Sequence, residues 1–268
     1  MLRLVSMSGG KDSVALWLWA RRTGLEPRAV FCDTGWEAPQ TYDYLRYLEE
    51  VVGPIVKLTS EGFAERTVRG GTFPSRVRKW CSPELKVEPF AAYVATLDDD
   101  CEVLVGMRRE ESPDRAALSE REWQKDYDCE VWRPILDWTL ADVIAEHHRA
   151  GVALNPLYLL GAERVGCWPC IHARKSELRI ISEIDPARIE RVAAVEKEVG
   201  QTMFALEASR AGGAERKLIP TGIHGVVAWS KTKRGGKKLA VIPEPSGCAK
   251  WGICDAPVPA DDDDDCGS

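Results

Sequence analysis

Near the N-terminus, the hexapeptide Ser-Gly-Gly-Lys-Asp-Ser at positions 8–13 has the composition of a phosphate-binding turn. It follows the apolar run Leu2 to Met7 and precedes a long apolar-periodic stretch, which predicts a strand, a tight turn and a helix. Glycines let the backbone approach an anion, and the first amides and the dipole of a helix favour negative charge. The residues expected to hold phosphates are Ser8, Gly9, Gly10, Lys11 and Ser13.

Lys11 and Asp12 are the charged members of this turn. An ammonium at Lys11 can stabilise departing pyrophosphate, and a carboxylate at Asp12 is placed for the Mg²⁺ that accompanies ATP. The spacings of a Walker A loop and of a G-x-G-x-x-G fingerprint are both absent. A bare Gly-Gly-Lys also fits an ordinary turn before a helix. If the turn binds the phosphates of ATP, Lys11 and Asp12 are both expected to be catalytic.

A second candidate centre is the C-x-x-C pair of Cys167 and Cys170. Two thiolates at this spacing bind zinc or an iron–sulfur cluster, or they form a redox dithiol. A thioredoxin-type dithiol belongs near the start of a small α/β domain, whereas this pair comes late in the chain. Cys81 is the expected third thiolate, and Cys248 or Cys254 the fourth. These residues alone do not separate zinc from iron.

The surroundings of Cys81 predict a helix that begins beside it. Ser82 and Pro83 have the residue types of a helix cap and a first helical position. A thiol beside a helix N-terminus has a lowered pKa, which suits a ligand or a nucleophile. The preceding stretch, Glu61 to Lys79, contains paired glycines, a proline and the cations Arg76, Arg78 and Lys79, so it is expected to be a mobile loop over the site or a solvated basic loop.

The elements that position these residues alternate between strands and helices. Such alternation predicts an α/β fold with a doubly wound parallel sheet and the nucleotide at the switch point. Asp33 and Gly35 follow a strand and are expected to border the nucleoside. The expected strands are 2–7, 28–32, 54–58 and 101–107, and the expected helices are 12–23, 39–52, 140–150 with Thr139 as cap, 175–182 and 186–211.

Three regions are expected along the chain: a nucleotide-binding α/β domain over residues 1–160, a mainly helical cysteine-rich region over 161–260, and a disordered acidic tail over 261–268. The 268 residues are 44% hydrophobic, enough for one large core with an appendage. The net charge is −6, but Asp261 to Asp265 supply five of these charges, so the remainder is near neutral and local basic patches matter more. One such patch is Lys231 to Lys238, which fits a solvated loop or a phosphate-backbone contact.

No stretch has the length and apolarity of a membrane span, and the N-terminus lacks the pattern of a secretory signal. A cytoplasmic protein is therefore expected. In that compartment, nine cysteines point to metal or redox chemistry rather than disulfides.

The motifs, in their order and spacing over roughly residues 1–185, resemble the phosphoadenosine phosphosulfate (PAPS) reductase superfamily, whose nucleotide loop is the PP-loop of the N-type ATP pyrophosphatases. Those motifs are S-G-G-K-D-S, D-T-G at 33–35, C-S-P-E-L-K at 81–86, G-M-R-R-E-E-S at 106–112, P-I-L-D-W-T at 134–139 and N-P-L-Y at 155–158. Arg108 in the fourth motif is expected to be catalytic with Lys11 and Asp12 and is well placed to bind a sulfate or second phosphate, or it pairs with Glu110 or Glu111.

The resemblance implies a [4Fe–4S] cluster, because cluster-bearing relatives use a Cys-Cys pair plus a later C-x-x-C. Here Trp80-Cys81 stands where that pair would be, so either an iron remains open or a C-terminal ligand, Cys254 in our assignment, completes the set of Cys81, Cys167 and Cys170. Reductases of this kind also carry a nucleophilic cysteine in a mobile C-terminal segment. Cys266 has that position, although five neighbouring aspartates would raise its pKa.

Two functions follow. The first is cleavage of ATP between the α and β phosphates to adenylate a substrate for iron–sulfur-dependent sulfur transfer, with a nucleic-acid acceptor and a sulfur or electron donor protein as partners. The second is a sulfonucleotide reductase that releases sulfite. Intact Lys11 and Asp12 favour the first, since the reductases typically lose both residues. The oligomeric state stays open.

Overall fold

The computed structural model describes residues 1–75, 77–209, 216–220 and 222–232. Several predictions therefore concern residues outside the described part: Arg76, Cys248, Cys254, Cys266, residues 233–238 of the basic segment and the acidic stretch Asp261 to Asp265.

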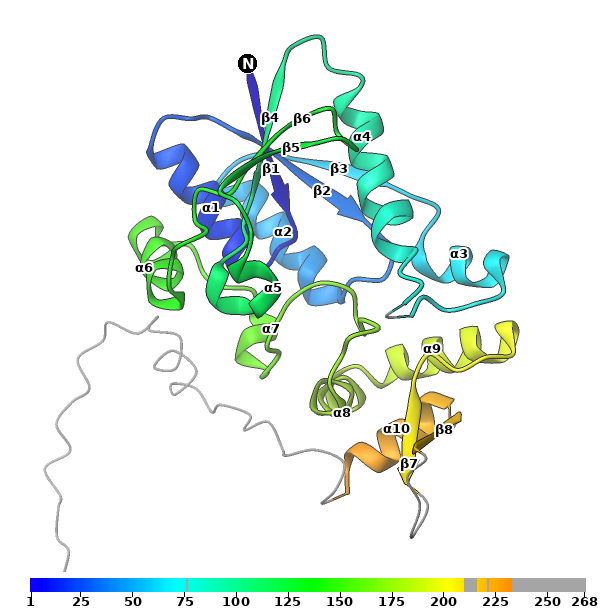
Figure 1. Cartoon of the computed structure of the whole chain (residues 1–268). Coiled ribbons are helices and arrows are strands. Elements are labelled where there is room, and N and C mark those ends of the chain that lie inside the picture. The colour runs from blue at the N-terminus through cyan, green and yellow to red at the C-terminus, as the bar shows by residue number, and fades with distance from the viewer. Residues whose placement is uncertain (76, 210–215, 221, 233–268) are drawn as a thin grey trace, which may run out of the picture.

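A six-stranded sheet with the order β3-β2-β1-β4-β6-β5 forms the centre of the fold (Figure 1). Neighbouring strands are parallel except at one edge, where β5 runs antiparallel to β6. These two strands are joined by residues 125–128 alone, and so short a connection allows only an antiparallel pair. The strands are β1 (Leu2–Met7), β2 (Arg28–Asp33), β3 (Ile55–Thr59), β4 (Cys101–Val105), β5 (Arg121–Gln124) and β6 (Cys129–Trp132). The predicted α/β class is confirmed, and the sheet is mixed but mostly parallel.

Helices cover both faces of this sheet, as a doubly wound fold requires (Figure 1). Successive strand residues point to opposite faces, so Val5 packs with Leu16 and Leu45 on one side while Leu4 packs with Phe90 on the other. The first side is covered by α1 (Lys11–Arg22), α2 (Pro39–Val51) and α6 (Leu140–Ala150), and the second by α4 (Glu88–Val94).

A further group of helices lies below the sheet in Figure 1, near the carboxyl ends of β1 and β2. Its apolar core joins Trp36, Phe63 and Trp80 to Leu178 and Val192, and therefore spans both sides of the predicted boundary at residue 160. Its members are α3 (Phe63–Gly70), α8 (Lys175–Ile184), α9 (Pro186–Val199) and α10 (Gly222–Ser230), with the antiparallel pair β7 (Ala205–Ser209) and β8 (Arg216–Pro220) between α9 and α10. Shorter elements are a π-helical turn (Pro83–Val87), a 3₁₀ turn (Arg109–Glu111), α5 (Pro113–Ala116) and α7 (Pro156–Leu159).

Two sequence predictions about this region are wrong. The stretch predicted as a loop between Glu61 and Lys79 contains α3, because Phe63, Ala64 and Thr67 form a buried helical face against the lower core. The helix predicted over residues 186–211 ends at Val199, since Gly200 adopts a left-handed conformation (φ 72°) that stops the helix.

The cap predicted for α6 is confirmed. The Thr139 hydroxyl accepts a hydrogen bond from the Asp142 amide, and the Asp142 carboxylate accepts one from the Thr139 amide at 2.8 Å. This reciprocal pair satisfies two otherwise unpaired amides at the helix start. None of the helices in the described part of the chain has the length and apolarity needed to cross a membrane.

Candidate functional site

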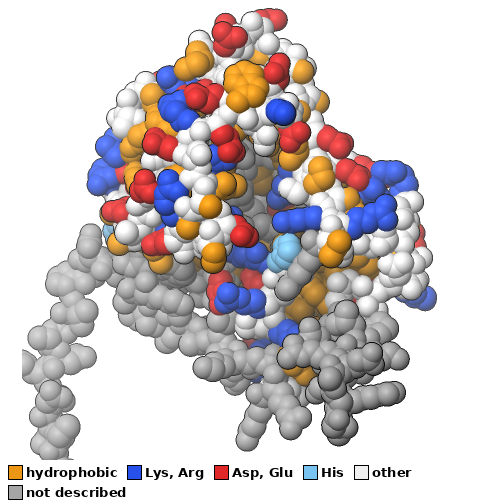
Figure 2. Space-filling model, in the orientation of Figure 1, with side chains coloured by type: hydrophobic (Ala, Val, Ile, Leu, Met, Phe, Trp, Pro, Cys, Tyr) orange, Lys and Arg blue, Asp and Glu red, His pale blue; other side chains and the backbone are white. Residues whose placement is uncertain are grey.

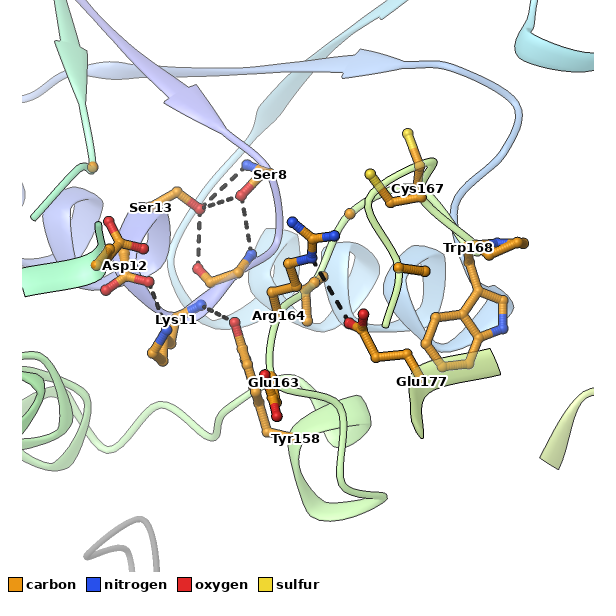
Figure 3. Close-up of a pocket in the computed structure, with 18 of the residues that line it drawn as sticks. Ser8, Lys11, Asp12, Ser13, Tyr158, Glu163, Arg164, Cys167, Trp168 and Glu177 are labelled. Carbon is orange, nitrogen blue, oxygen red and sulfur yellow. Dashed lines mark hydrogen bonds and ion pairs between the residues drawn. The ribbon is translucent and has the colours of Figure 1, made fainter. Parts of the chain in front are cut away.

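The two predicted centres open into one cavity of about 340 Å³ at the carboxyl edge of the sheet (Figure 3). The turn at positions 8–13 forms one end of it, and the segment that carries Cys167 and Cys170 forms the other. Of the predicted phosphate-binding residues, the cavity wall includes Ser8, Gly10, Lys11 and Ser13, together with Asp12. The structure thus brings together residues more than 150 positions apart.

Hydrogen bonds within the turn fix its shape. The Ser13 hydroxyl accepts from the Ser8 amide at 3.2 Å and donates to the Gly10 carbonyl at 3.0 Å. Gly9 has φ 70°, a conformation that side-chain-bearing residues rarely adopt. The turn consequently places the N-terminus of α1 on the cavity wall, and the end of a helix with this polarity favours anions.

The motif N-P-L-Y holds this turn from below. The Asn155 amide group donates to the Gly9 carbonyl at 3.2 Å, while its oxygen accepts from the Leu157 amide and caps α7. The Tyr158 hydroxyl accepts from the Lys11 amide at 3.1 Å. Both side chains are buried. The sequence identified this motif only by its resemblance, and the structure gives it a physical role.

Lys11, Asp12 and Arg108 form a buried chain of charges. Lys11 Nζ lies 2.8 Å from one Asp12 carboxylate oxygen, and Arg108 Nε lies 2.6 Å from the other. Burial raises the pKa of Asp12, but Lys11 and Arg108 outweigh that effect and hold it below its usual value. Asp12 is therefore ionised at neutral pH.

Arg108 is 3% exposed and also pairs with Glu110, one of the two partners weighed from the sequence. It is not among the residues that line the cavity. In this structure its guanidinium is occupied with holding Asp12, and its contact with a second anion remains a prediction.

Other charged residues in the cavity wall were missed by sequence reasoning. Arg115 and Arg164 lie on the wall, as do Lys86 and Glu177. Arg164 faces Glu177 at 3.7 Å (Figure 3), and burial raises the pKa of Glu177 above its ordinary value. The position of Arg164, three residues before Cys167, was the one available signal. Figure 2 shows this face of the molecule, where Lys and Arg side chains gather beside the hollow.

The three predicted thiol ligands in the described part, Cys81, Cys167 and Cys170, lie near one another and near Lys86. Cys170 is close enough to interact electrostatically with both Cys81 and Cys167, and Lys86 is close enough to interact with all three thiols. Burial raises the pKa of Cys167 to about 11 and also raises the pKa of Cys81. The predicted lowering at Cys81 is wrong, because burial is the largest influence on this thiol and raises its pKa. Ser82 is itself helical and makes no side-chain cap.

Among the described residues, no group of three or more His, Cys, Asp or Glu side chains is arranged to hold a metal ion. Zinc and a [4Fe–4S] cluster are both bound by cysteine thiolates, so this finding does not separate the two. The predicted fourth ligand, Cys254, lies outside the described residues.

A second cavity of about 120 Å³ adjoins the first and shares Ser8, Lys86 and Gly166 with it. Its other walls are mainly apolar and aromatic: Met7, Phe31, Phe90 and Tyr127 contribute. Neither cavity is lined by the predicted nucleoside neighbours Asp33 and Gly35. Instead, the Asp33 carboxylate accepts from the Gly35 amide at 2.8 Å and from the Tyr42 hydroxyl at 2.7 Å, which fixes the turn after β2.

The sequence profile of the phosphoadenosine phosphosulfate reductase domain matches residues 3–173. This span includes the turn at positions 8–13, the other motifs named above and the cysteine pair. The chain belongs to this family. The resemblance predicted from the motifs is thereby confirmed.

Relatives of this PAPS reductase-family chain include proteins with and without an assigned activity. A 37.8 kDa protein of Escherichia phage 186 is 33% identical over 325 aligned positions, covering 95% of this chain and 97% of the phage protein. An adenosine 5'-phosphosulfate reductase of Allochromatium vinosum is 30% identical over 61% of this chain and 66% of its own length. A solved phosphoadenylyl-sulfate reductase from Candida auris shares 22% identity, with a TM-score of 0.49 over 63% of this chain and 82% of that one.

Gly106, in the family motif after β4, provides a test of how tightly the turn is packed. A Cβ atom at this position would lie 2.8 Å from the Asp12 carbonyl oxygen and 2.9 Å from the Ser13 nitrogen. Backbone atoms cannot yield as a flexible side chain does, so Gly106→Ala should cost about 1–3 kcal/mol of folding free energy and weaken phosphate binding. Thermal unfolding and pyrophosphate titration measure the two effects.

Gly24→Ala is the matched control for Gly106→Ala. Gly24 has φ 77°, and a Cβ atom added to it would meet no other atom within 4 Å, so alanine strains the backbone there without touching the turn. It should lower stability while leaving pyrophosphate affinity unchanged. Equal loss of affinity in both variants would contradict the steric explanation.

Proposed function

We propose that the chain binds an adenine nucleotide at the turn of positions 8–13 and cleaves ATP between the α and β phosphates, adenylating an acceptor for sulfur transfer. The observation that carries the proposal is the pairing of Lys11 with an ionised Asp12 in a cavity whose opposite wall bears Cys167 and Cys170. Phosphate and sulfur chemistry would then share one chamber.

The two adjoining cavities suggest how the nucleotide lies. The loop amides and the N-terminus of α1 suit the phosphates. The apolar walls of the smaller cavity, with Phe31 and Phe90, suit a nucleobase. Ser8 and Gly166 border both spaces, so one ligand can extend through both.

Lys11 and Asp12 change partners in this proposal. In the structure, the Lys11 ammonium satisfies one Asp12 oxygen and Arg108 satisfies the other. A polyphosphate attracts Lys11 away and frees that carboxylate oxygen for Mg²⁺, which binds one or two carboxylates together with substrate phosphates. Arg108 keeps the remaining oxygen in place.

In the adenylation step, an acceptor oxygen attacks the α-phosphorus, the bond to the bridging oxygen breaks, and pyrophosphate leaves with its charge neutralised by Lys11 and Mg²⁺. A sulfur nucleophile then displaces AMP from the adenylated acceptor. The acceptor we propose is a nucleic acid, drawn by the basic segment that begins at Lys231. A sulfur or electron donor protein completes the cycle.

Cys81, Cys167 and Cys170, with Cys254, would hold a [4Fe–4S] cluster beside this chamber. When bound, such a cluster supplies sulfur or electron transfer. Zinc suits the proposal less, because the family resemblance implies an iron–sulfur cluster.

The second candidate is a sulfonucleotide reductase, which is favoured by the relatives named adenosine 5'-phosphosulfate reductase. A thiolate would attack the sulfur of the phosphosulfate, AMP would leave, and a second thiol would release sulfite as a disulfide forms. Cys266 is the candidate nucleophile from the sequence.

Equilibrium binding separates the two functions. Anaerobically purified protein with its iron counted should bind Mg·ATP and release pyrophosphate, and should bind adenosine phosphosulfate and PAPS at least tenfold more weakly, a difference of about 1.4 kcal/mol. Preference for a sulfonucleotide would overturn the adenylation proposal in favour of the reductase.

A further inference from the structure

The hydroxyl of Tyr158 lies between the phosphate-binding turn and the segment that leads to the cysteine pair. Tyr158 belongs to α7 and is 2% exposed. Its oxygen accepts from the Lys11 amide at 3.1 Å, and Val165 packs against Tyr158 with its backbone placed to donate to the same oxygen. One phenol oxygen therefore joins the first turn of α1 to a residue two positions before Cys167.

Gly10 makes this junction possible. A Cβ atom on Gly10 would lie 3.3 Å from the Tyr158 oxygen and 3.9 Å from the Val165 Cβ, which is tight enough to disturb the phenol. The absence of a side chain thus lets three segments meet at one point. Figure 3 shows Tyr158 reaching up to the Lys11 backbone beneath the chain that continues to Arg164 and Cys167.

The phenol oxygen accepts from a backbone donor of the kind that binds phosphate oxygens. The Lys11 amide is one of the first amides of a twelve-residue helix, and such amides are donors to bound anions. A charged phosphate oxygen is a stronger acceptor than a neutral hydroxyl. The Lys11 ammonium lies 5.4 Å from the centre of the Tyr158 ring, so a phosphate that draws this ammonium also approaches the phenol.

We propose that Tyr158 is a positioning residue that couples phosphate occupancy of the turn to the placement of Cys167. A phosphate on the Lys11 amide displaces the phenol, the Val165 amide loses its acceptor, and the segment through Gly166 to Cys167 is released to move. Gly166 borders both cavities, so this movement changes the chamber where the two chemistries meet. The inference rests on the proposed phosphate binding and adds a route from it to the thiol.

Hydrogen–deuterium exchange of the full chain, with and without magnesium pyrophosphate, tests this coupling. In the unmodified protein, pyrophosphate should slow exchange of the amides at positions 9–13 and speed exchange of the Val165 amide about tenfold, as expected for loss of one hydrogen bond. Tyr158→Phe should give the faster Val165 exchange without ligand, and pyrophosphate should no longer change it.

Pyrophosphate affinity shows whether the Tyr158 hydroxyl competes with phosphate or only supports the turn. Because the phenol competes with phosphate for the Lys11 amide, Tyr158→Phe should bind pyrophosphate up to about tenfold more tightly. Tyr47→Phe is the matched control, since the Tyr47 hydroxyl also accepts one backbone amide, that of Ala153, at 3.1 Å but lies outside the cavity. It should match the unmodified protein in Val165 exchange and in affinity.

Three outcomes would overturn the inference. Protection of positions 9–13 with no change at Val165 in the unmodified protein refutes the coupling and leaves the proposed function standing. No protection at positions 9–13 refutes phosphate binding and the coupling together. Weaker pyrophosphate binding by Tyr158→Phe refutes the competition. If that variant does not fold, the ligand response of the unmodified protein still decides the question.

Discussion

Replacing Lys11 by alanine should weaken Mg·ATP binding roughly 10- to 100-fold, as expected for loss of one charge-assisted hydrogen bond. It should lower pyrophosphate release further, on the order of 10²–10³-fold, because the ammonium acts most strongly on the charge of the leaving group. Isothermal titration and a pyrophosphate-release assay measure these effects. The loop amides remain in the variant, so residual binding should persist.

The fold should survive this substitution. Asp12 keeps its contact with Arg108 at 2.6 Å, so the buried carboxylate is not left unpaired. Lys57→Ala is the matched control: it also removes a lysine that pairs with a carboxylate, that of Glu49 at 2.7 Å, but on an outer strand. Its binding and turnover should be unchanged. Turnover of Lys11→Ala equal to that of the control would refute the site assignment.

Local sequence signals explain which parts of the fold could be predicted. The turn at positions 8–13, the strand before it and the helix after it depend on neighbours in the chain, and all three form as expected. The cap at Thr139 is local for the same reason, since its partner Asp142 is three residues away. Interactions over such short spacings can be read from residue types alone.

Contacts between distant segments explain the errors. The contact of Arg108 with Asp12, 96 positions earlier, was not foreseen from the sequence, although its predicted contact with an anion stays a prediction. The pKa of Cys81 was predicted from a nearby helix terminus, whereas its burial among distant residues raises it. The helix α3 was predicted as a loop because its glycines and following proline are visible in the sequence, while the aromatic core that Phe63 joins is not.

The same reasoning applies to the cavity. Its turn and its cysteine pair were recognised as separate centres, and their meeting at one chamber follows from the strand order, which no motif states. Arg115 and Arg164 became candidates only when the structure brought them to the wall. A sequence motif shows which reactive side chains are present, whereas the topology of the fold determines which of them face the same cavity.

Replacing Cys167 by alanine should remove most of the iron from anaerobically purified protein and abolish its visible absorption. Cys167 lies next to Lys86 and Cys170 in the cavity wall, so its loss leaves two described thiolates for a cluster that needs at least three. Iron and sulfide content per chain, with the visible spectrum, measure the result. Thermal unfolding of the variant reports whether the fold is retained.

Cys32→Ala is a stringent control for this prediction. The Cys32 thiol also lies near Lys86, donating to its carbonyl oxygen at 3.4 Å, and burial likewise raises its pKa to about 11. Nearness to the lysine and burial are therefore shared, but Cys32 lines the smaller cavity and stands outside the proposed ligand set. Iron retained in Cys32→Ala and lost in Cys167→Ala supports that set. Iron unaffected by Cys167→Ala would refute it, and the cavity would then combine a phosphate-binding turn with free thiols.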